Sequence, residues 1–201
     1  MRTEKLRIRQ YLSQNMKTTK QKNKKDFFGL ERGHVIHTLA SEHEMILHFL
    51  DKLEQTSKSI QKMIKFDGKK KEFGMLSHVI EHLIAADAHH KREEKVLFPE
   101  IEKHGIVGPS EVMRAEHNHL KQREKNLAKL IKSIENADFS EFKKQIKNEV
   151  EFIIAFLREH IFKENNVLYP MALQIIKDIG KWQSMKKKCD KIGYCCFTPK
   201  R

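Results

Sequence analysis

The sequence predicts an all-α protein, an antiparallel up-down four-helix bundle with a basic extension at each end. Apolar residues make up 39% of the 201 residues, which is enough for a core, whereas Gly (8) and Pro (4) are sparse. Apolar positions recur at helical spacing through the middle of the chain, and no alternating strand pattern of any length occurs. Short polar loops separate the helical segments, which is typical of bundles with antiparallel neighbours.

The first two helices are expected at residues 34–64 and 71–103. The first carries an apolar stripe that ends at Ile64, and the turn signal Asp67-Gly68 separates it from the second. Pro99 lies inside the second helix, where a proline ring clashes with the preceding turn. We therefore expect this helix to kink or restart near Pro99.

The last two helices are expected to begin at capping residues. Ser110 is a plausible N-cap for a third helix over residues 110–136. Either Asp138 or Ser140 can cap a fourth helix, which continues past a second kink at Pro170.

The net charge of +13 is carried by the two ends of the chain. Residues 1–25 hold nine Lys/Arg against one Glu, residues 181–201 hold seven against one Asp, and residues 26–180 hold 24 against 25 acidic residues. We therefore expect a basic, flexible N-terminal extension (1–30), a helical body (31–180) and a basic, cysteine-containing C-terminal tail (181–201).

Several classes of protein are disfavoured. Basic tails can hold phosphate backbones, but no nucleic-acid motif and no aromatic platform among the Lys/Arg accompanies them, so a nucleic-acid partner is not expected. No run approaches the roughly 20 apolar residues of a membrane span, and the polar N-terminus has no signal-peptide pattern. A cytoplasmic protein without a membrane partner is expected. Cys189, Cys195 and Cys196 form no disulfide framework and are expected to be free thiols.

Two segments of the body repeat each other without a gap. HHKREEKVLFP and HIFKENNVLYP align position by position at an offset of 71 residues, so that His89 matches His160 and Glu93 matches Glu164. A solvated helix surface gives no reason for such a repeat.

Each half of the chain also carries a Glu-His pair ahead of its repeat segment. SEHEMIL contains His43, and AEHNHLK contains His117, 46 and 43 residues before the histidine of the matching HxxxE segment. His34, His37 and His48 compete with His43 on the first helix, but only His43 shares the Glu-His context of His117. The candidate metal ligands are His43, His89, Glu93, His117, His160 and Glu164.

This set of residues suits a binuclear metal site. A His and a Glu four residues apart lie on one helix face, and a bundle brings inward faces within about 10 Å of one another. Imidazole and carboxylate together favour iron, with manganese or zinc as alternatives. Two bridging carboxylates leave room for an oxo or hydroxo bridge and a diatomic ligand. The competing interpretation is a duplicated structural unit whose HxxxE segments form only hydrogen bonds or weak ion pairs.

At these residues the sequence resembles the hemerythrin-like family, also called HHE cation-binding domains. Within the family it is most similar to di-iron proteins that repair damaged iron centres. The resemblance rests on HHKREEKVLFP, VMRAEHNHL and HIFKENNVLYPMAL and covers about residues 34–178. It implies a four-helix bundle with two non-haem iron ions held by the six candidates, with Glu93 and Glu164 as bridging carboxylates.

The sequence departs from two patterns of the family. Oxygen-carrying hemerythrins have HxxxH on the third helix, whereas Lys121 stands four residues after His117 here, which disfavours an oxygen carrier. The repair proteins also have a small N-terminal domain with a cysteine pair, and the basic lead-in of this chain has no cysteine.

Other residues near the motifs are expected to have structural roles. His90 and His119 neighbour candidate ligands but are expected to point elsewhere, and to be either exposed or in contact with the ligands from outside. Phe98 and Tyr169, which occupy matching positions in the repeat, are expected to cap the core at the end of the bundle.

The expected function is that of a non-haem di-iron protein that binds or reacts with O2, NO or peroxide. Its context would be oxidative or nitrosative stress, iron handling or sensing, with a redox or iron-sulfur protein as partner. The alternatives are an oxygen carrier of the hemerythrin type, and a metal or redox sensor that acts through a protein partner and uses the cysteine-bearing tail.

Overall fold

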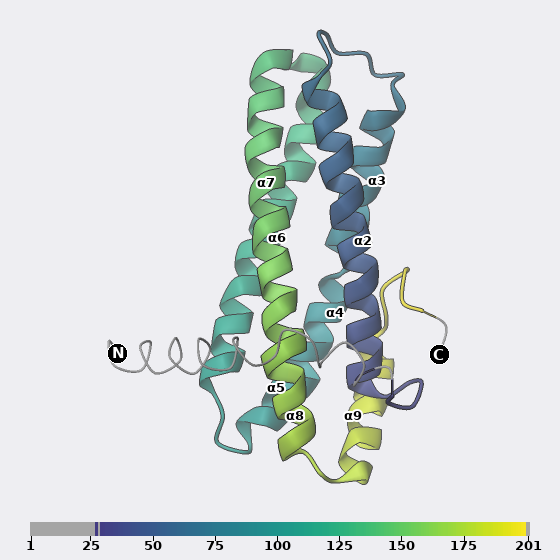
Figure 1. Cartoon of the computed structure of the whole chain (residues 1–201), viewed down its shortest axis with the longest axis vertical. Helices are drawn as coiled ribbons and strands as arrows, with labels where there is room; N and C mark the ends of the chain where they lie inside the picture. The colour runs from purple at the N-terminus through teal and green to yellow at the C-terminus, as the bar shows by residue number, and fades with distance from the viewer. Residues whose placement is uncertain (1–26, 28, 200–201) are drawn as a thin grey trace, which may run out of the picture.

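The body of the protein is a bundle of long helices. A computed structural model describes residue 27 and residues 29–199, and no strand occurs among these residues, so the predicted all-α class is confirmed. The long helices are α2 (Val35–Gln61), α3 (Lys71–Ala85), α6 (Gly108–Ser133) and α7 (Phe139–Lys163). They lie side by side along the long axis of the molecule (Figure 1), and α2 and α6 each contact both α3 and α7. The four helices therefore enclose one common interior.

The predicted interruptions at the prolines take the form of π-helical turns. The second helical segment continues from α3 through α4 (Asp87–Arg92), the π-helix η1 (Glu93–Leu97) and α5 (Phe98–Glu102). After α7, the π-helix η3 (Glu164–Leu168) and α8 (Tyr169–Ile175) repeat this order. Each proline is the second residue of the α-helix that follows, a first-turn position where its missing N–H is not needed. The chain therefore passes each proline without losing its helical course.

Two of the predicted helix ends differ from the structure. The first helix stops before Ile64, whose side chain is 98% exposed, because the chain turns away after the last helical residue. The third helix begins before Ser110, and the Ser110 hydroxyl donates to the carbonyl of Val107 instead of capping the helix. Asp138 does cap the fourth helix, accepting a 2.8 Å hydrogen bond from the backbone N–H of Glu141. A short 3-10 helix, η2 (Ile134–Asn136), ends the third helical segment.

A polar layer separates two apolar clusters in the interior. Along α2, Leu39 belongs to one cluster and Ile46 to the other, and the buried His43 lies between them. The same order occurs on α6, where buried His117 lies between the two clusters. The apolar packing on both sides thus fixes the height of the polar layer in the bundle.

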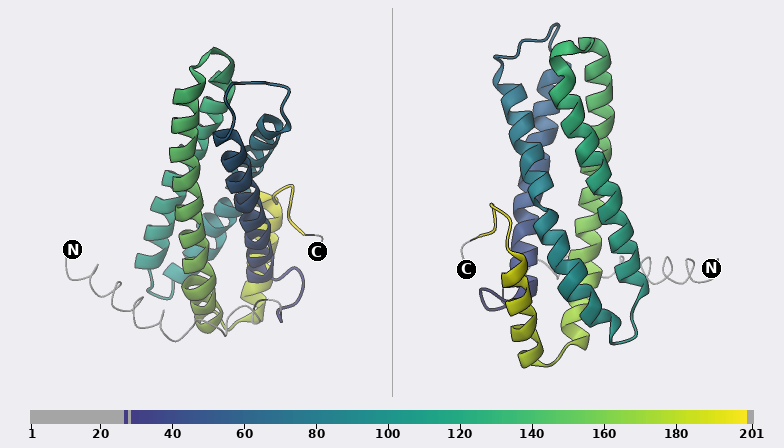
Figure 2. Two further views of the ribbon diagram at one scale, coloured as in Figure 1. Left: turned by 45° about the horizontal axis from the view of Figure 1, so that its top comes forward. Right: turned by 180° about the vertical axis from the view of Figure 1, so that it is seen from behind.

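The segment expected as a tail contains a further helix. Helix α9 (Ile179–Ile192) contacts α2, α4 and η1, beside which it lies in the rear view of Figure 2. Trp182 and Cys189 are buried in this contact, and the ring of Trp182 lies 4.5 Å from that of His34. The expectation of a flexible segment at residues 1–30 falls almost entirely outside the described residues.

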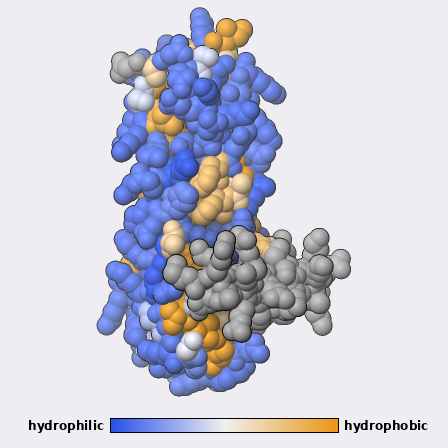
Figure 3. All heavy atoms as spheres, turned by 90° about the vertical axis from the view of Figure 1, so that its left-hand side faces the viewer, coloured by the Kyte–Doolittle hydropathy of each residue, from blue (hydrophilic) through white to orange (hydrophobic). Residues whose placement is uncertain are grey.

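The surface is largely polar. Figure 3 shows a face on which hydrophilic residues dominate and hydrophobic ones form separate patches. In the part of the chain that the structure describes, no helix combines the length and the hydropathy needed to cross a membrane.

The buried carboxyl of Glu124 makes stability depend on pH. Glu124 lies on α6, and burial, followed by the nearby Asp87, raises its pKa from 4.5 to about 8. Between pH 4.5 and about 8 the folded chain holds a proton on Glu124 that the unfolded chain releases. The contribution of Glu124 to the free energy of unfolding therefore falls as pH rises through this range.

The Glu124→Gln variant should remove this effect. Its melting temperature should exceed that of the wild type by roughly 5 °C or more at pH 8.5 and differ little at pH 5, because one pKa unit corresponds to about 1.4 kcal/mol. Thermal unfolding of both chains across this pH range measures the difference. Equal pH profiles would contradict the assignment of this slope to Glu124.

Candidate metal centre

The six predicted ligands converge in the polar layer. Each of the four long helical segments contributes a histidine, and the first residue of each π-helix contributes a glutamate. No member of the set is more than 3% exposed: His43, His89, Glu93, His117, His160 and Glu164.

The histidines form two close pairs. Nε2 of His43 is 3.1 Å from Nε2 of His89, and Nε2 of His117 is 3.1 Å from Nε2 of His160. Each pair joins the Glu-His segment of one half to the HxxxE segment of the same half. The two histidines that each half carries are therefore adjacent in space.

The two carboxylates lie between the histidine pairs. Oε2 of Glu164 is 3.1 Å from Nε2 of His43, and its Oε1 is 3.2 Å from Nε2 of His160. Oε2 of Glu93 is 3.5 Å from the Nε2 atom of one histidine in each pair. Both carboxylates can thus reach both halves of the site, as bridging ligands must.

The π-helical turns direct two consecutive residues toward the site. HxxxE places the histidine and the glutamate on one helix face. The glutamate also begins the π-helix, whose wider turn is a feature often found at functional sites. The following residues, Glu94 and Asn165, also face the interior and contact ring nitrogens of His117 and His43.

Every predicted histidine ligand is held through Nδ1 by an acceptor. The four contacts are 2.7–2.8 Å long: His89 to Glu42, His160 to Glu116, His117 to Glu94, and His43 to Asn165. A carboxylate only accepts, so Nδ1 carries the proton and Nε2 presents its lone pair to the site. Such outer partners fix the tautomer and orientation of metal-ligating histidines.

The geometry fits a bound cation better than a closed hydrogen-bond network. With Nδ1 donating, the facing Nε2 atoms of His43 and His89 have no proton to share at 3.1 Å. In the other pair, burial lowers the pKa of His160, but Glu164 and Glu116 outweigh burial and raise this pKa to about 9, so this ring holds the one additional proton. Among the described residues, the buried side-chain oxygens without a hydrogen-bond partner include Oε2 of Glu93 and both oxygens of Glu164. Unpaired buried carboxylate oxygens are unfavourable, whereas a cation would satisfy them together with the nitrogen lone pairs.

Comparison with known families decides which group of proteins uses this arrangement. The profile described as "Hemerythrin HHE cation binding domain" matches residues 34–172. This chain belongs to the hemerythrin HHE family. The matched range contains all six predicted ligands and both π-helices, and the resemblance inferred from the motifs is confirmed.

One curated relative in this family is the iron-sulfur cluster repair protein YtfE of Enterobacter sp. (strain 638). It is 37% identical over 95 residues, which cover 43% of this chain and 41% of the relative. The match therefore spans about two fifths of the length of that protein.

The hemerythrin HHE site of this chain carries unequal charges. Burial and the nearby Glu164 raise the pKa of Glu93 well above its ordinary value. Burial acts in the same direction on Glu164, but His160 and its neighbours outweigh it and hold the pKa of Glu164 well below the ordinary range. Burial lowers the pKa of His89 to about 4, against the opposing effect of Glu42. The two buried carboxyls are thus kept from ionising together by protonation of Glu93.

Of the two places expected for His90, exposed or in contact with the ligands, the structure shows the second. Its ring does not point away into solvent but is buried, with its centroid 4.0 Å from that of His117. Burial, followed by the nearby His117 and His89, holds the pKa of His90 well below its ordinary value. The only feature of the sequence that points to this position is that His90 directly follows the predicted ligand His89. His119 is exposed, as expected, and packs on Phe152.

Tyr169 does more than cap the core. Its hydroxyl donates a 2.6 Å hydrogen bond to Oε1 of Glu93 and lies 3.4 Å from Nε2 of His43. Phe98, at the matching position of the other half, is equally buried but has no hydroxyl. Burial and the carboxyls of Glu93 and Glu164 raise the pKa of Tyr169 well above its ordinary value, so the hydroxyl stays a donor.

The remaining first-helix histidines and Lys121 lie outside the site. His34 accepts from the backbone N–H of Ile36 at the start of α2, and His48 is exposed. Lys121 pairs with Asp87 at 2.6 Å near the surface. His37 lies beside the hydroxyl of Ser41, so His43 is the first-helix histidine that groups with His89, Glu93 and Glu164.

A buried ion pair links the site to the C-terminal segment. Arg92 is 1% exposed and donates to both carboxylate oxygens of Glu42, at 2.7 and 2.6 Å. The Thr198 hydroxyl donates to the same carboxylate, and the ring of Tyr194 lies 4.6 Å from the Arg92 guanidinium. Because Glu42 holds His89, the C-terminal segment contacts the support of a predicted ligand. Sequence reasoning missed this network.

Proposed function

We propose that this chain is a non-haem di-iron protein that binds or reacts with O2, NO or peroxide. Iron handling or the response to oxidative or nitrosative stress would be its cellular context. The single observation that carries the proposal is the set of four histidine Nε2 atoms and three carboxylate oxygens without a hydrogen-bond partner, Oε2 of Glu93 and both oxygens of Glu164, which face one another in a buried layer. Mixed imidazole and carboxylate ligands suit iron.

The six residues would have defined roles in such a centre. His43 and His89 would hold one iron, His117 and His160 the other, and Glu93 and Glu164 would bridge them, within the up-down four-helix arrangement expected from the sequence. Bound iron would supply open positions for a diatomic ligand and one-electron redox chemistry. The protein would orient the imidazoles through their Nδ1 partners, and the Tyr169 hydroxyl would remain a proton donor at Glu93 Oε1.

The name of the relative supports an iron-related role. That protein is described as repairing iron-sulfur clusters, and the matched segment is 37% identical. We therefore propose an iron-sulfur protein or a redox protein as the partner of this chain.

The metal content of anaerobically purified protein tests the proposal. We expect about two irons per chain, and an absorption spectrum that changes on exposure to O2 and, in a separate sample, to NO. A reversible change would favour binding or sensing, and an irreversible one would favour reaction or iron release. A folded protein that takes up no metal after reconstitution with ferrous iron would refute the di-iron assignment.

A further inference from the structure

One histidine beside the site is not explained by the internal repeat. At the offset of 71 residues, His90 corresponds to Ile161, a buried apolar residue. The six predicted ligands keep His opposite His and Glu opposite Glu in the two halves. The fold therefore accepts an aliphatic side chain at this position, and an imidazole there is particular to one half.

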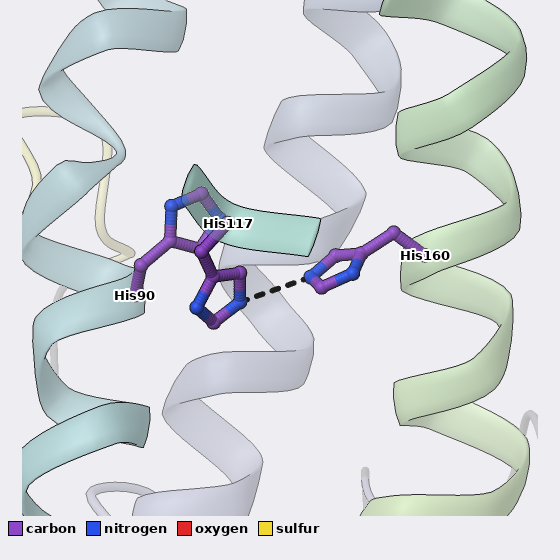
Figure 4. Close-up of side chains that lie close together, drawn as sticks. All are labelled: His90, His117 and His160. Carbon is purple, nitrogen blue, oxygen red and sulfur yellow. Dashed lines mark hydrogen bonds between the residues drawn. The ribbon is translucent and has the colours of Figure 1, made fainter. Parts of the chain in front are cut away.

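The ring of His90 lies against one of the two histidine pairs. It stacks on His117 with a centroid distance of 4.0 Å and an interplanar angle of 21°, and it meets the ring of His160 edge-on at 6.0 Å. One nitrogen from each of these three histidines lies within 4.8 Å of the others. Figure 4 shows the three rings converging from different helices, with the contact between His117 and His160 drawn as a dashed line.

The surrounding side chains that the structure describes make no hydrogen bond to the nitrogens of His90. The other four histidines each use Nδ1 to contact a glutamate or an asparagine. Within the described part of the chain, the ring of His90 has aromatic contacts but no hydrogen bond to a protein group. The ring is 9% exposed, so its nitrogens are available to water or to a ligand.

We propose that His90 is a fifth histidine ligand of the metal centre, and that its ring rotates out of the stack on His117 to join His117 and His160 at one of the two metal positions. This inference rests on the proposed function. It makes the centre unequal, with three imidazoles at one position and two, His43 and His89, at the other. The additional histidine would come from the second helical segment, since the third helix carries Lys121 in its place.

Two variants separate ligation from packing. His90→Ile introduces the residue that the other half carries at this position. His90→Phe keeps an aromatic ring over His117 but has no donor nitrogen. Both are made in the full-length chain, purified anaerobically and loaded with ferrous iron enriched in 57Fe. Circular dichroism of the metal-free variants checks that each is folded.

The readouts are iron affinity, from competition with a chelator, and the Mössbauer spectrum. We expect the wild type to show two ferrous doublets of equal area, because the ligand sets differ. Both variants should bind one of the two irons at least about 10-fold more weakly, with a changed doublet for that iron only.

Three results would overturn the inference. If both variants bind two irons with wild-type affinity and spectra, His90 is not a ligand and the di-iron proposal stands. If only His90→Ile differs from the wild type, His90 acts through stacking. A wild-type chain that binds no iron would refute the proposed function and this inference together, which separates that case from the first two.

Discussion

The Glu93→Gln variant is expected to lose its metal and keep its fold. Oε2 of Glu93 has no hydrogen-bond partner among the residues that the structure describes, and it faces one histidine of each pair, so its charge would be shared by both cations. Loss of a single outer partner of a metal ligand already costs about 10–100-fold in affinity, and removal of a bridging ligand should cost at least 100-fold. Because the pKa of Glu93 is raised, glutamine closely mimics the neutral acid of the metal-free chain.

Metal content after desalting and thermal unfolding of the metal-free protein measure the two parts of this expectation. The metal-free variant should melt within about 3 °C of the wild type, since glutamine can still accept from the Tyr169 hydroxyl. Glu159→Gln is the matched control, because Glu159 directly precedes His160 but is 72% exposed and, within the described part of the chain, pairs only with Lys163. Full retention of two metals by Glu93→Gln would rule out a bridging role for this carboxylate.

Replacing Arg92 with methionine is expected to destabilise the protein strongly. The guanidinium is almost fully buried and bonds to both oxygens of Glu42, which in turn holds His89. Removal of one partner leaves the other charge buried and uncompensated, which typically costs about 3–5 kcal/mol. For a chain of this size the melting temperature should fall by roughly 10 °C.

The other half of the chain provides a control for this change. Lys163 corresponds to Arg92 at the repeat offset and pairs with Glu116, but its side chain is 20% exposed. Lys163→Met should therefore lower the melting temperature by no more than about 4 °C, since solvent screens a partly exposed pair. Equal losses in the two variants, measured by thermal unfolding at pH 7, would show that burial does not set the strength of this interaction.

The fold and the six predicted ligands follow from local rules that the sequence displays. Helical spacing of apolar residues and short loops sufficed for the all-α class. The spacing of His89 and Glu93 fixes their common helix face before any tertiary contact forms, and the repeat identifies His160 and Glu164 as their counterparts. His43 required an extra argument, because three other histidines lie in the predicted first helix.

The residues that hold the Nδ1 atoms of the histidines are set by how the helices pack on one another, and the sequence shows this packing only in part. Glu42 and Glu116 directly precede His43 and His117, a pattern that singled out those histidines, yet each glutamate bonds to a histidine of another helical segment. The sequence left the place of His90 open because a regular helix directs adjacent residues about 100° apart, and the site accommodates both members of the doublet. The contacts of Thr198 come from a segment without any motif.

Each half of the chain supplies a side chain that orients a histidine of the other half, so the chain resembles a dimer whose two subunits are covalently linked. Glu94 of the first half holds His117 of the second, and Asn165 of the second half holds His43 of the first. Because both halves lie on one chain, assembly of the centre needs no association step and is independent of protein concentration. Covalent linkage also lets the halves diverge, which identical subunits cannot do. One imidazole is held by a carboxylate and its counterpart by an amide, so the two histidines differ in basicity.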